Sequence, residues 1–257
     1  MDLGLTNKKA LILGSSSGLG LAIASQLAAE GAHVAISGRD AERAAKAVVS
    51  SGAKLAVTGD MTQAGQAKYI VDSAAEKLQG LDIIVINTGG GSPGGILDVS
   101  PEARDKAYDI MLRPTLEAAA AAAPHLKKST NGRMVFITAR SIVEATPELA
   151  LSSVFRSGVS AAARSLALEL APDVLVNVII PGQFDTPAYG RFAEWVSEQE
   201  GKEIEEIRAA DAKANPLGRL GQAEEFANVV TFVCSDRSSF INGSVIRVDG
   251  GAVKGFH

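Results

Sequence analysis

Short apolar runs alternate with longer amphipathic stretches along most of this chain. The runs expected to form strands are residues 10–13, 34–37, 54–58, 83–87, 134–138, 175–180 and 244–248. The stretches expected to form helices lie near residues 19–30, 41–50, 63–78, 101–126, 154–170 and 223–234. Continuous apolar strands that alternate with helices predict a parallel sheet with helices on both faces.

No linker or change in composition divides the 257 residues, of which 46% are hydrophobic and 21% charged. This balance supports a large core and argues against disorder. We therefore expect one doubly wound α/β domain over residues 1–257, built on a mainly parallel seven-stranded sheet.

The formal net charge is −4 and no basic cluster stands out, which argues against nucleic acid as a partner. No apolar run approaches the ~20 residues that span a membrane, so no membrane contact is expected. Residues 1–5 lack the charged and apolar regions of a signal peptide, and a cytoplasmic location is the resulting expectation.

The cysteine and histidine residues do not suggest a metal site. Cys234, the one cysteine, sits in an apolar run and is expected to be a small core residue. His33, His125 and His257 are far apart and have no carboxylates at ligand spacing. We therefore expect no bound metal.

A glycine-rich turn follows the first predicted strand. Gly14, Gly18 and Gly20 lie between that strand and an alanine-rich stretch at residues 21–30. A strand, a glycine turn and a helix together place a phosphate at a helix N-terminus, where backbone N–H groups are unpaired. A tight strand-to-helix turn without a ligand would use the same residues, so the spacing alone leaves both interpretations open.

The second predicted strand ends at Gly38 and Arg39, about twenty positions past the glycine turn. An acidic residue usually stands here to bind the ribose 2′-hydroxyl of NAD. An arginine instead attracts a 2′-phosphate, which favours NADP(H) as the cofactor. The alternative is a solvated arginine at the start of the next helix, with Asp40 as the helix N-cap.

Polar residues also follow the third and fourth predicted strands, where ligands bind in open α/β sheets. Asp60 can accept a hydrogen bond from an adenine amino group, although it can equally cap the helix that follows. Asn87 can join neighbouring strand ends, and the glycines after it allow close approach of a cofactor.

Motifs over residues 3–251 resemble those of the short-chain dehydrogenase/reductases, and the branch is similar to the 3-oxoacyl-carrier-protein reductases. The motifs are Gly14-Ser-Ser-Ser-Gly18-Leu-Gly20, Asp60, Asn87-Thr-Gly-Gly, Pro181-Gly182 with Thr186, Pro216-Leu-Gly-Arg-Leu-Gly221 with Glu224-Glu225, Phe240-Ile-Asn-Gly243 and Val248-Asp-Gly-Gly251. The resemblance implies a Rossmann domain with a small helical lid, here near residues 184–215. It also implies a homo-oligomer, a tetramer or a dimer, built on the helices predicted at residues 101–126 and 154–170.

The resemblance also implies a cofactor role for individual residues. The pyrophosphate and adenosine would contact Gly14, Ser16, Ser17, Gly18, Leu19 and Gly20. The 2′-phosphate would contact Arg39, the adenine Asp60 and Met61, the ribose region Asn87 and Gly89, and the nicotinamide Pro181, Gly182 and Thr186.

The family's catalytic residues do not match this chain. The family uses a serine, a tyrosine followed four positions later by a lysine, and an asparagine. The corresponding positions here hold Ala139, Ser152, Arg156 and Met111. A serine hydroxyl is a far weaker acid than a phenol of pKa about 10, and an arginine stays protonated at ordinary pH.

Other residues could polarise a substrate carbonyl in this chain. Ser141, Ser152 and Arg156 are the predicted catalytic residues, with Thr138 and Arg140 as further candidates. Ser141 could equally cap a loop, and Arg140 could be a solvated loop residue. Tyr189 in the lid could replace the missing acid, although a lone lid tyrosine more often packs against its neighbours.

These observations favour an NADP(H)-dependent oxidoreductase that acts on a carbonyl/alcohol pair, with 3-oxoacyl compounds as one candidate class. The lid carries aromatic and aliphatic residues among many charges, which suggests a small-molecule substrate that is apolar in part. The alternative is a catalytically inactive NADP(H)-binding regulatory or partner subunit, because the tyrosine, lysine and asparagine are all replaced. Non-redox chemistry on the same fold is a less favoured third class.

Overall fold

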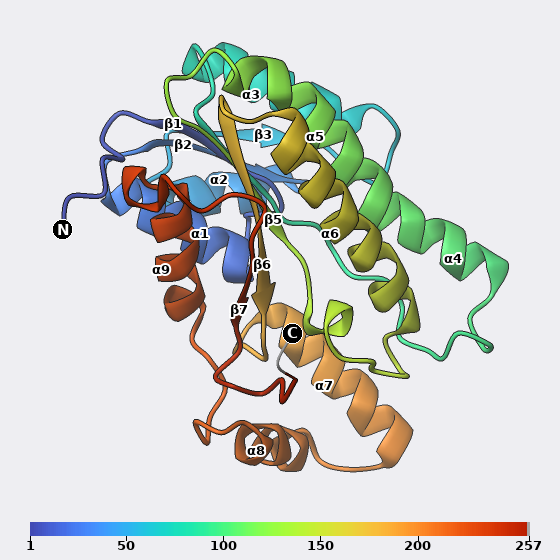
Figure 1. The fold of residues 1–257 in the computed structure, drawn as a ribbon. Coiled ribbons are helices and arrows are strands. Elements are labelled where there is room, and N and C mark those ends of the chain that lie inside the picture. The colour runs from blue at the N-terminus through green and yellow to red at the C-terminus, as the bar shows by residue number, and fades with distance from the viewer. Residues whose placement is uncertain (256–257) are drawn as a thin grey trace.

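The computed structural model describes residues 1–255, so His257 lies outside the described residues (Figure 1). Within that range, seven strands form one sheet in the order β3-β2-β1-β4-β5-β6-β7, and every neighbouring pair is parallel. The strands are β1 (Lys9–Ile12), β2 (His33–Gly38), β3 (Leu55–Thr58), β4 (Ile83–Ile86), β5 (Gly132–Ile137), β6 (Val174–Pro181) and β7 (Val245–Val248). The predicted doubly wound α/β fold is confirmed.

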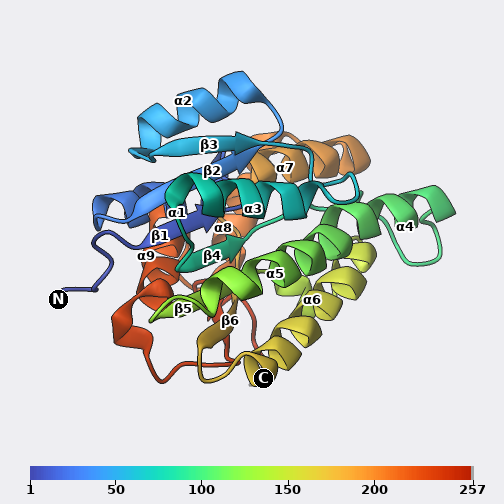
Figure 2. The ribbon, with the colours of Figure 1, turned by 90° about the horizontal axis from the view of Figure 1, so that it is seen from above.

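Helices cover both faces of the sheet (Figures 1 and 2). One face carries α1 (Gly18–Ala29), α2 (Ala41–Ser51) and α9 (Ala223–Cys234), and the other carries α3 (Gln66–Leu78), α5 (Arg113–Leu126) and α6 (Ala150–Glu169). Alternate residues of β4 divide between the two cores: Ile83 and Val85 face the first set, and Ile84 and Ile86 face the second. This period of two explains why the strand reads as a continuous apolar run.

The predicted helix at residues 101–126 is interrupted. It consists of α4 (Pro101–Ala107), a π-helical turn (Tyr108–Leu112) and α5. Pro114 lacks the N–H that would donate to the carbonyl four residues earlier, so regular α-helix cannot run through this point. The Thr115 hydroxyl instead donates to the Met111 carbonyl, at 2.7 Å. The helix is therefore irregular beside Pro114.

The predicted starts of two helices differ from the structure by three or four residues. The α3 helix begins at Gln66, three residues later than predicted, because Gly65 takes a left-handed conformation with φ of 79°. The α6 helix begins at Ala150, four residues earlier than predicted, and the Ala150 N–H donates to the Gly94 carbonyl. A short 3-10 turn (Arg140–Ile142) precedes α6, and another (Asp236–Ser238) follows α9.

The segment expected to form a lid contains α7 (Pro187–Glu200) and α8 (Ile204–Ala214). Both follow the carboxyl end of β6, and they pack on one another through Tyr189, Ala193 and Ile207 (Figure 1). None of the helices found between residues 1 and 255 has the length and apolar character needed to traverse a bilayer.

Candidate active site

The glycine turn lies at the carboxyl end of β1, beside the end of β2. The Ser15 hydroxyl donates to the Ile12 carbonyl at 2.6 Å and accepts from the Ser37 N–H at 3.0 Å. In return the Ser37 hydroxyl accepts from the Gly14 N–H at 3.1 Å. These bonds fix the start of the turn and leave its later residues, Ser16 and Ser17, partly or fully exposed.

Glycine is required at two positions of this turn. A Cβ on Gly20 would lie 2.3 Å from the Gly14 carbonyl oxygen, and one on Gly14 would lie 2.5 Å from the Asn87 carbonyl oxygen. Gly14 and Gly18 also have positive φ, 59° and 56°. The backbone segments are therefore packed too closely here for residues that carry a side chain.

The turn fits an anionic ligand. Ser17 is the N-cap residue of α1, but no side chain caps the helix and no acidic residue lies in its first turn. The first N–H groups of α1, at Gly18, Leu19 and Gly20, therefore remain available, and the helix dipole favours a negative group there.

Arg39 is exposed at the end of β2. Its neighbour Asp40 accepts a hydrogen bond from the Arg43 N–H at 2.7 Å and caps α2, as the alternative interpretation of this segment predicted. Ser16 packs against Gly38, where an added Cβ would approach its hydroxyl oxygen to 3.1 Å. The turn after β1 and the end of β2, which carries Arg39, are thus in contact through Ser16 and Gly38.

Asp60 closes a local turn at the end of β3. Its carboxylate accepts from the Thr62 N–H at 3.1 Å and from the Thr62 hydroxyl at 2.8 Å. It does not cap α3, whose N-cap residue is Gly65. Met61 is partly buried against the core beneath.

Asn87 joins the ends of β1 and β4, as expected. Its side-chain amide donates to the Gly14 carbonyl at 3.0 Å. The sheet order reverses between these two strands, so the joint lies at the switch point where open α/β sheets bind ligands. The next residues, Thr88 and Gly89, continue along this edge.

The last predicted cofactor residues follow β6. The Gly182 N–H donates to the Val248 carbonyl at 2.9 Å, and a Cβ on Gly182 would lie 2.6 Å from the Asp249 Cα. Thr186 caps α7 by accepting from the Tyr189 N–H at 3.3 Å. An added Cβ on Gly18 would lie 3.6 Å from the Thr186 Cβ, so the glycine turn faces the start of the lid.

Two predicted catalytic serines lie next to each other. Ser141 is buried in the 3-10 turn after β5, and Ser152 is in the first turn of α6. Their hydroxyl oxygens are 3.0 Å apart. In such a pair one hydroxyl donates to the other, and the second hydroxyl keeps its own proton for a further acceptor.

Arg156 lies one helical turn beyond Ser152 and is buried, with 7% of its surface exposed. Its guanidinium donates to the carbonyls of Ile137 at 3.1 Å, Thr88 at 3.1 Å and Gly89 at 2.9 Å. Burial lowers the pKa of Arg156 to about 10, so the group is protonated at neutral pH.

Met111 stands at the family's asparagine position and is fully buried. It packs with Ala107 and Leu151 in an apolar cluster. Gly91 lies against the same side chain, since a Cβ there would come within 3.0 Å of the methionine methyl group. Met111 therefore offers apolar contact where the family resemblance implies an asparagine amide.

The remaining candidates from the sequence are Thr138, Arg140 and Tyr189. Thr138 is buried, and within residues 1–255 its hydroxyl has no hydrogen-bond partner. Arg140 pairs with Glu144 at 3.3 Å. The Tyr189 hydroxyl donates to Asp211 at 2.7 Å, and burial together with that carboxylate raises the pKa of Tyr189 well above its ordinary value. Tyr189 is therefore a poor proton donor that belongs to lid packing.

Comparison with known proteins places this arrangement in a family. A family model described as enoyl-(acyl carrier protein) reductase matches residues 14–253. Dehydrogenase/reductase SDR family member 4 of Homo sapiens is 33% identical over 254 residues, covering 96% of this chain and 88% of that protein. The chain belongs to the short-chain dehydrogenase/reductase family.

Solved structures of this short-chain dehydrogenase/reductase family superpose closely on the chain. L-sorbose reductase from Gluconobacter frateurii, complexed with NADPH and L-sorbose, has a TM-score of 0.93 and 29% identity, with 100% of both chains covered. The aldohexose dehydrogenase of Thermoplasma acidophilum has a TM-score of 0.86 and 26% identity, covering 96% of this chain and 94% of that one.

Sequence reasoning missed one feature of this short-chain dehydrogenase/reductase. The loop after β4 pairs with the segment before α6, where the Gly94 N–H donates to the Glu148 carbonyl at 2.6 Å and Gly94 forms a parallel bridge with Leu149. The glycine-rich run from Gly89 to Gly95 marked this loop as able to approach another backbone, but nothing in the sequence named its partner.

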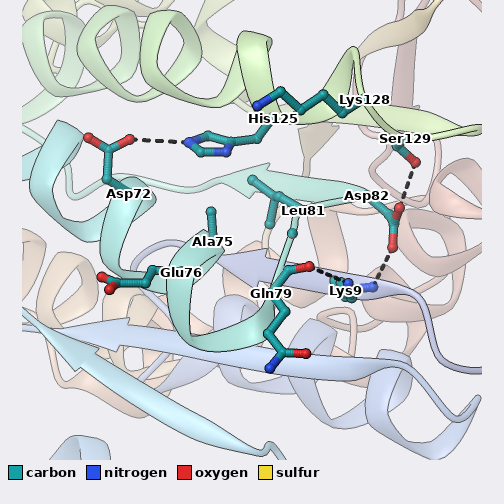
Figure 3. A pocket seen from close by; sticks show the side chains of 11 residues that line it. Lys9, Asp72, Ala75, Glu76, Gln79, Leu81, Asp82, His125, Lys128 and Ser129 are labelled. Atoms are coloured by element: carbon teal, nitrogen blue, oxygen red, sulfur yellow. Dashed lines mark hydrogen bonds and ion pairs between the residues drawn. The ribbon is translucent and has the colours of Figure 1, made fainter.

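A cavity of about 460 Å³ lies between α3 and α5 (Figure 3). Four of its lining side chains form two pairs: His125 lies 3.3 Å from Asp72, and the Ser129 hydroxyl donates to Asp82 at 2.6 Å. The cavity borders Lys9 and Asp82, at the amino ends of β1 and β4. It therefore lies at the edge of the sheet opposite the glycine turn and is separate from the candidate site. No cluster of three or more potential metal ligands occurs in residues 1–255.

Proposed function

We propose that this protein is an NADP(H)-dependent oxidoreductase that interconverts a carbonyl compound and an alcohol. The observation that carries the proposal is the Ser141–Ser152 pair, whose hydroxyl oxygens are 3.0 Å apart at the carboxyl edge of the sheet. A contact chain links this pair to the nucleotide turn. It runs from Gly14 through Asn87 to the backbone of Thr88 and Gly89, and from there through Arg156 to α6, which carries Ser152.

The nucleotide would be held by residues from five strand ends, those of β1, β2, β3, β4 and β6. The uncapped N-terminus of α1 would bind the pyrophosphate, and the exposed Arg39 guanidinium would bind the 2′-phosphate. Asp60 and Met61 would flank the adenine, Asn87 and Gly89 the ribose region. Pro181, Gly182 and Thr186 would border the nicotinamide. NADPH rather than NADH is favoured because position 39 holds a cation and Gly38 before it is not acidic.

The serine pair would act on the substrate oxygen. When bound, the reduced cofactor supplies a hydride to the carbonyl carbon. Negative charge then develops on the oxygen, and the free hydroxyl proton of the serine pair donates a hydrogen bond to it. The proton that completes the alcohol comes from water, because serine does not ionise in the ordinary pH range and Arg156 is held on backbone carbonyls.

The substrate is proposed to be apolar in part. Met111 and Leu151 form an apolar cluster next to the serine pair, and the lid carries a stacked Phe192–Trp195 pair with ring centroids 6.2 Å apart. The L-sorbose reductase neighbour was solved with a ketose, so keto-sugars belong in the first substrate panel with 3-oxoacyl thioesters and simple ketones.

The test combines binding and turnover. NADPH and NADH are titrated by cofactor fluorescence, and NADPH oxidation is then followed across the carbonyl panel. Replacing Ser141 by Ala is expected to lower kcat by about 100-fold and to leave the NADPH Kd unchanged, the usual scale for loss of one oxyanion donor. Ser153→Ala is the matched control, because that hydroxyl bonds only the Leu149 carbonyl of its own helix.

A second function, a catalytically inactive NADP(H)-binding regulatory or partner subunit, is favoured by a specific observation. Met111 is fully buried and the Arg156 guanidinium is bound to three carbonyls, so neither can relay a proton. Tight NADPH binding with no oxidation of NADPH by any compound of the panel would select this function. Turnover that falls on Ser141→Ala substitution excludes it.

We also propose that the protein forms a homo-oligomer, a dimer or a tetramer. The α5 and α6 helices lie side by side on one face (Figure 2) and expose Leu116, Val154 and Leu168. Exposed apolar side chains on adjacent helices favour contact with another surface. Light scattering on the purified protein measures the mass directly, and a monomer at micromolar concentration contradicts this proposal.

A further inference from the structure

A single buried arginine connects the two strand ends on which the proposed reaction depends. Arg156 reaches from α6 to the Ile137 carbonyl at the end of β5 and to the Thr88 and Gly89 carbonyls after β4. These acceptors lie 19, 68 and 67 positions away in the sequence. Within residues 1–255 no carboxylate pairs with the guanidinium.

Burial of a cation without a carboxylate is costly, so its retention needs a reason. Here three carbonyl dipoles hold the charge, and the planar fork of the guanidinium allows it to bind acceptors on two strands at once. A lysine ammonium is a compact point charge and cannot span both strand ends from the same helix position. The arrangement therefore uses the shape of arginine as well as its charge.

The loop after β4 is the segment that gains most from this contact. It is rich in glycine, and an added Cβ on Gly90 would meet no atom within 4 Å. The loop is fixed near its beginning by Arg156 and near its middle by the bond between the Gly94 N–H and the Glu148 carbonyl. Without Arg156 the first of these two attachments is lost.

We propose that Arg156 is a positioning residue: it stays on these backbone carbonyls when nucleotide is bound and holds the serine pair in register with the nucleotide turn. Its role is exerted through Ser152, one helical turn away, and through Asn87, which precedes Thr88 and bonds Gly14. The alternative role for an arginine at this position is a bond to the hydroxyls of the nicotinamide ribose. The inference rests on the proposed function for its catalytic consequence only.

The experiment measures the Kd values of two ligands and the backbone hydrogen exchange of the protein. Adenosine 2′,5′-bisphosphate carries the adenine end of NADPH and lacks the nicotinamide ribose. For Arg156→Met we expect Kd values for NADPH and for the bisphosphate that both stay within about 3-fold of wild type, since neither ligand contacts the side chain. Backbone hydrogen exchange is expected to rise by about 10-fold or more in residues 88–95 and 137–149, and to stay unchanged in the glycine turn.

Arg133→Met is the matched control for the loss of a buried arginine. Arg133 is also buried and donates to two backbone carbonyls, those of Gly132 and Ser235, but it lies at the amino end of β5. It is expected to leave exchange in residues 88–95 unchanged. With a carbonyl compound that the wild-type protein reduces, Arg156→Met should lower kcat by about 10-fold or more and leave the KM for NADPH unchanged. Arg133→Met should change neither kcat nor KM.

Arg156→Lys keeps the charge and covers the case in which the methionine variant does not fold. The inference predicts that lysine does not restore the wild-type exchange pattern or kcat, because it cannot bridge the two strand ends. A rise of 10-fold or more in the NADPH Kd with an unchanged bisphosphate Kd would overturn the inference and assign Arg156 to the ribose. Wild-type behaviour of Arg156→Lys would overturn it as well.

Failure of the wild-type protein to bind NADPH would refute the proposed function instead, while the exchange measurement would still test the positioning role.

Discussion

The two halves of the carboxyl edge treat their polar groups in opposite ways. Around the glycine turn, donors are left open: the first N–H groups of α1 lack a side-chain cap, and Arg39 is exposed. Around the end of β5 and the start of α6, the proposed catalytic residues are bonded inside the protein, although within residues 1–255 the Thr138 hydroxyl has no partner. The hydroxyls of Ser141 and Ser152 bond one another, and Arg156 is buried on three carbonyls.

Under the proposed function, binding and reaction chemistry are separable on this fold. The residues proposed to bind the nucleotide come from the ends of β1 to β4 and of β6, whereas the serine pair comes from the segments after β5 and at the start of α6. The replacement of tyrosine and lysine that the family resemblance implies is therefore compatible with an intact glycine turn. What it removes is a titrating acid, since a serine hydroxyl does not ionise where a phenol does.

The largest expected effect is at the glycine turn. Gly20→Ala places a Cβ 2.3 Å from the Gly14 carbonyl oxygen, so the backbone must shift. A displacement of ~1 Å in a binding constellation costs about 100-fold, and we expect the NADPH Kd to rise by at least that factor. Gly190→Ala is the control, because a Cβ there meets no atom within 4 Å. An unchanged Kd for Gly20→Ala would remove the glycine turn from the nucleotide site.

A smaller effect is expected at Arg39. Its replacement by Ala should weaken NADPH by about 10- to 100-fold and leave NADH nearly unchanged, the scale of a hydrogen bond to a charged group. Arg43→Ala removes an equally exposed positive charge one helical turn away and serves as the control. Equal losses for NADPH and NADH would show that Arg39 does not recognise the 2′-phosphate.

The smallest effect is expected in the lid. Tyr189→Phe removes the hydrogen bond to Asp211 and leaves the ring in its packed position. We expect a loss of about 1 kcal/mol in the free energy of unfolding, near 2–4 °C in Tm, with kcat changed less than about twofold. A large fall in kcat at unchanged Tm would make Tyr189 the missing acid and contradict the assignment of that hydroxyl to lid packing.

Much of the fold could be predicted from the sequence because its cause is local. Apolar runs of four to six residues predicted the strands, and the glycines that follow β1 predicted the turn between β1 and α1. The start of α6 could not be predicted, because it depends on the Gly94 carbonyl, a residue 56 positions away. For the candidate site, counting from the motifs led to Ser141, Ser152 and Arg156. It did not reveal that the two hydroxyls meet or that the arginine turns to three backbone carbonyls, since these contacts exist only after the strands are assembled.

The most direct test of the account is the pH dependence of kcat for the wild-type protein with a carbonyl substrate and saturating NADPH. A serine pair with no titrating acid predicts a flat profile between about pH 6 and 9. The rate should then fall as the pH rises through about 10. Burial lowers the pKa of Arg156 to about 10, so the guanidinium is protonated below that pH and loses its proton above it. A profile with a midpoint between about pH 6 and 9 would show an ionising proton donor and contradict the account.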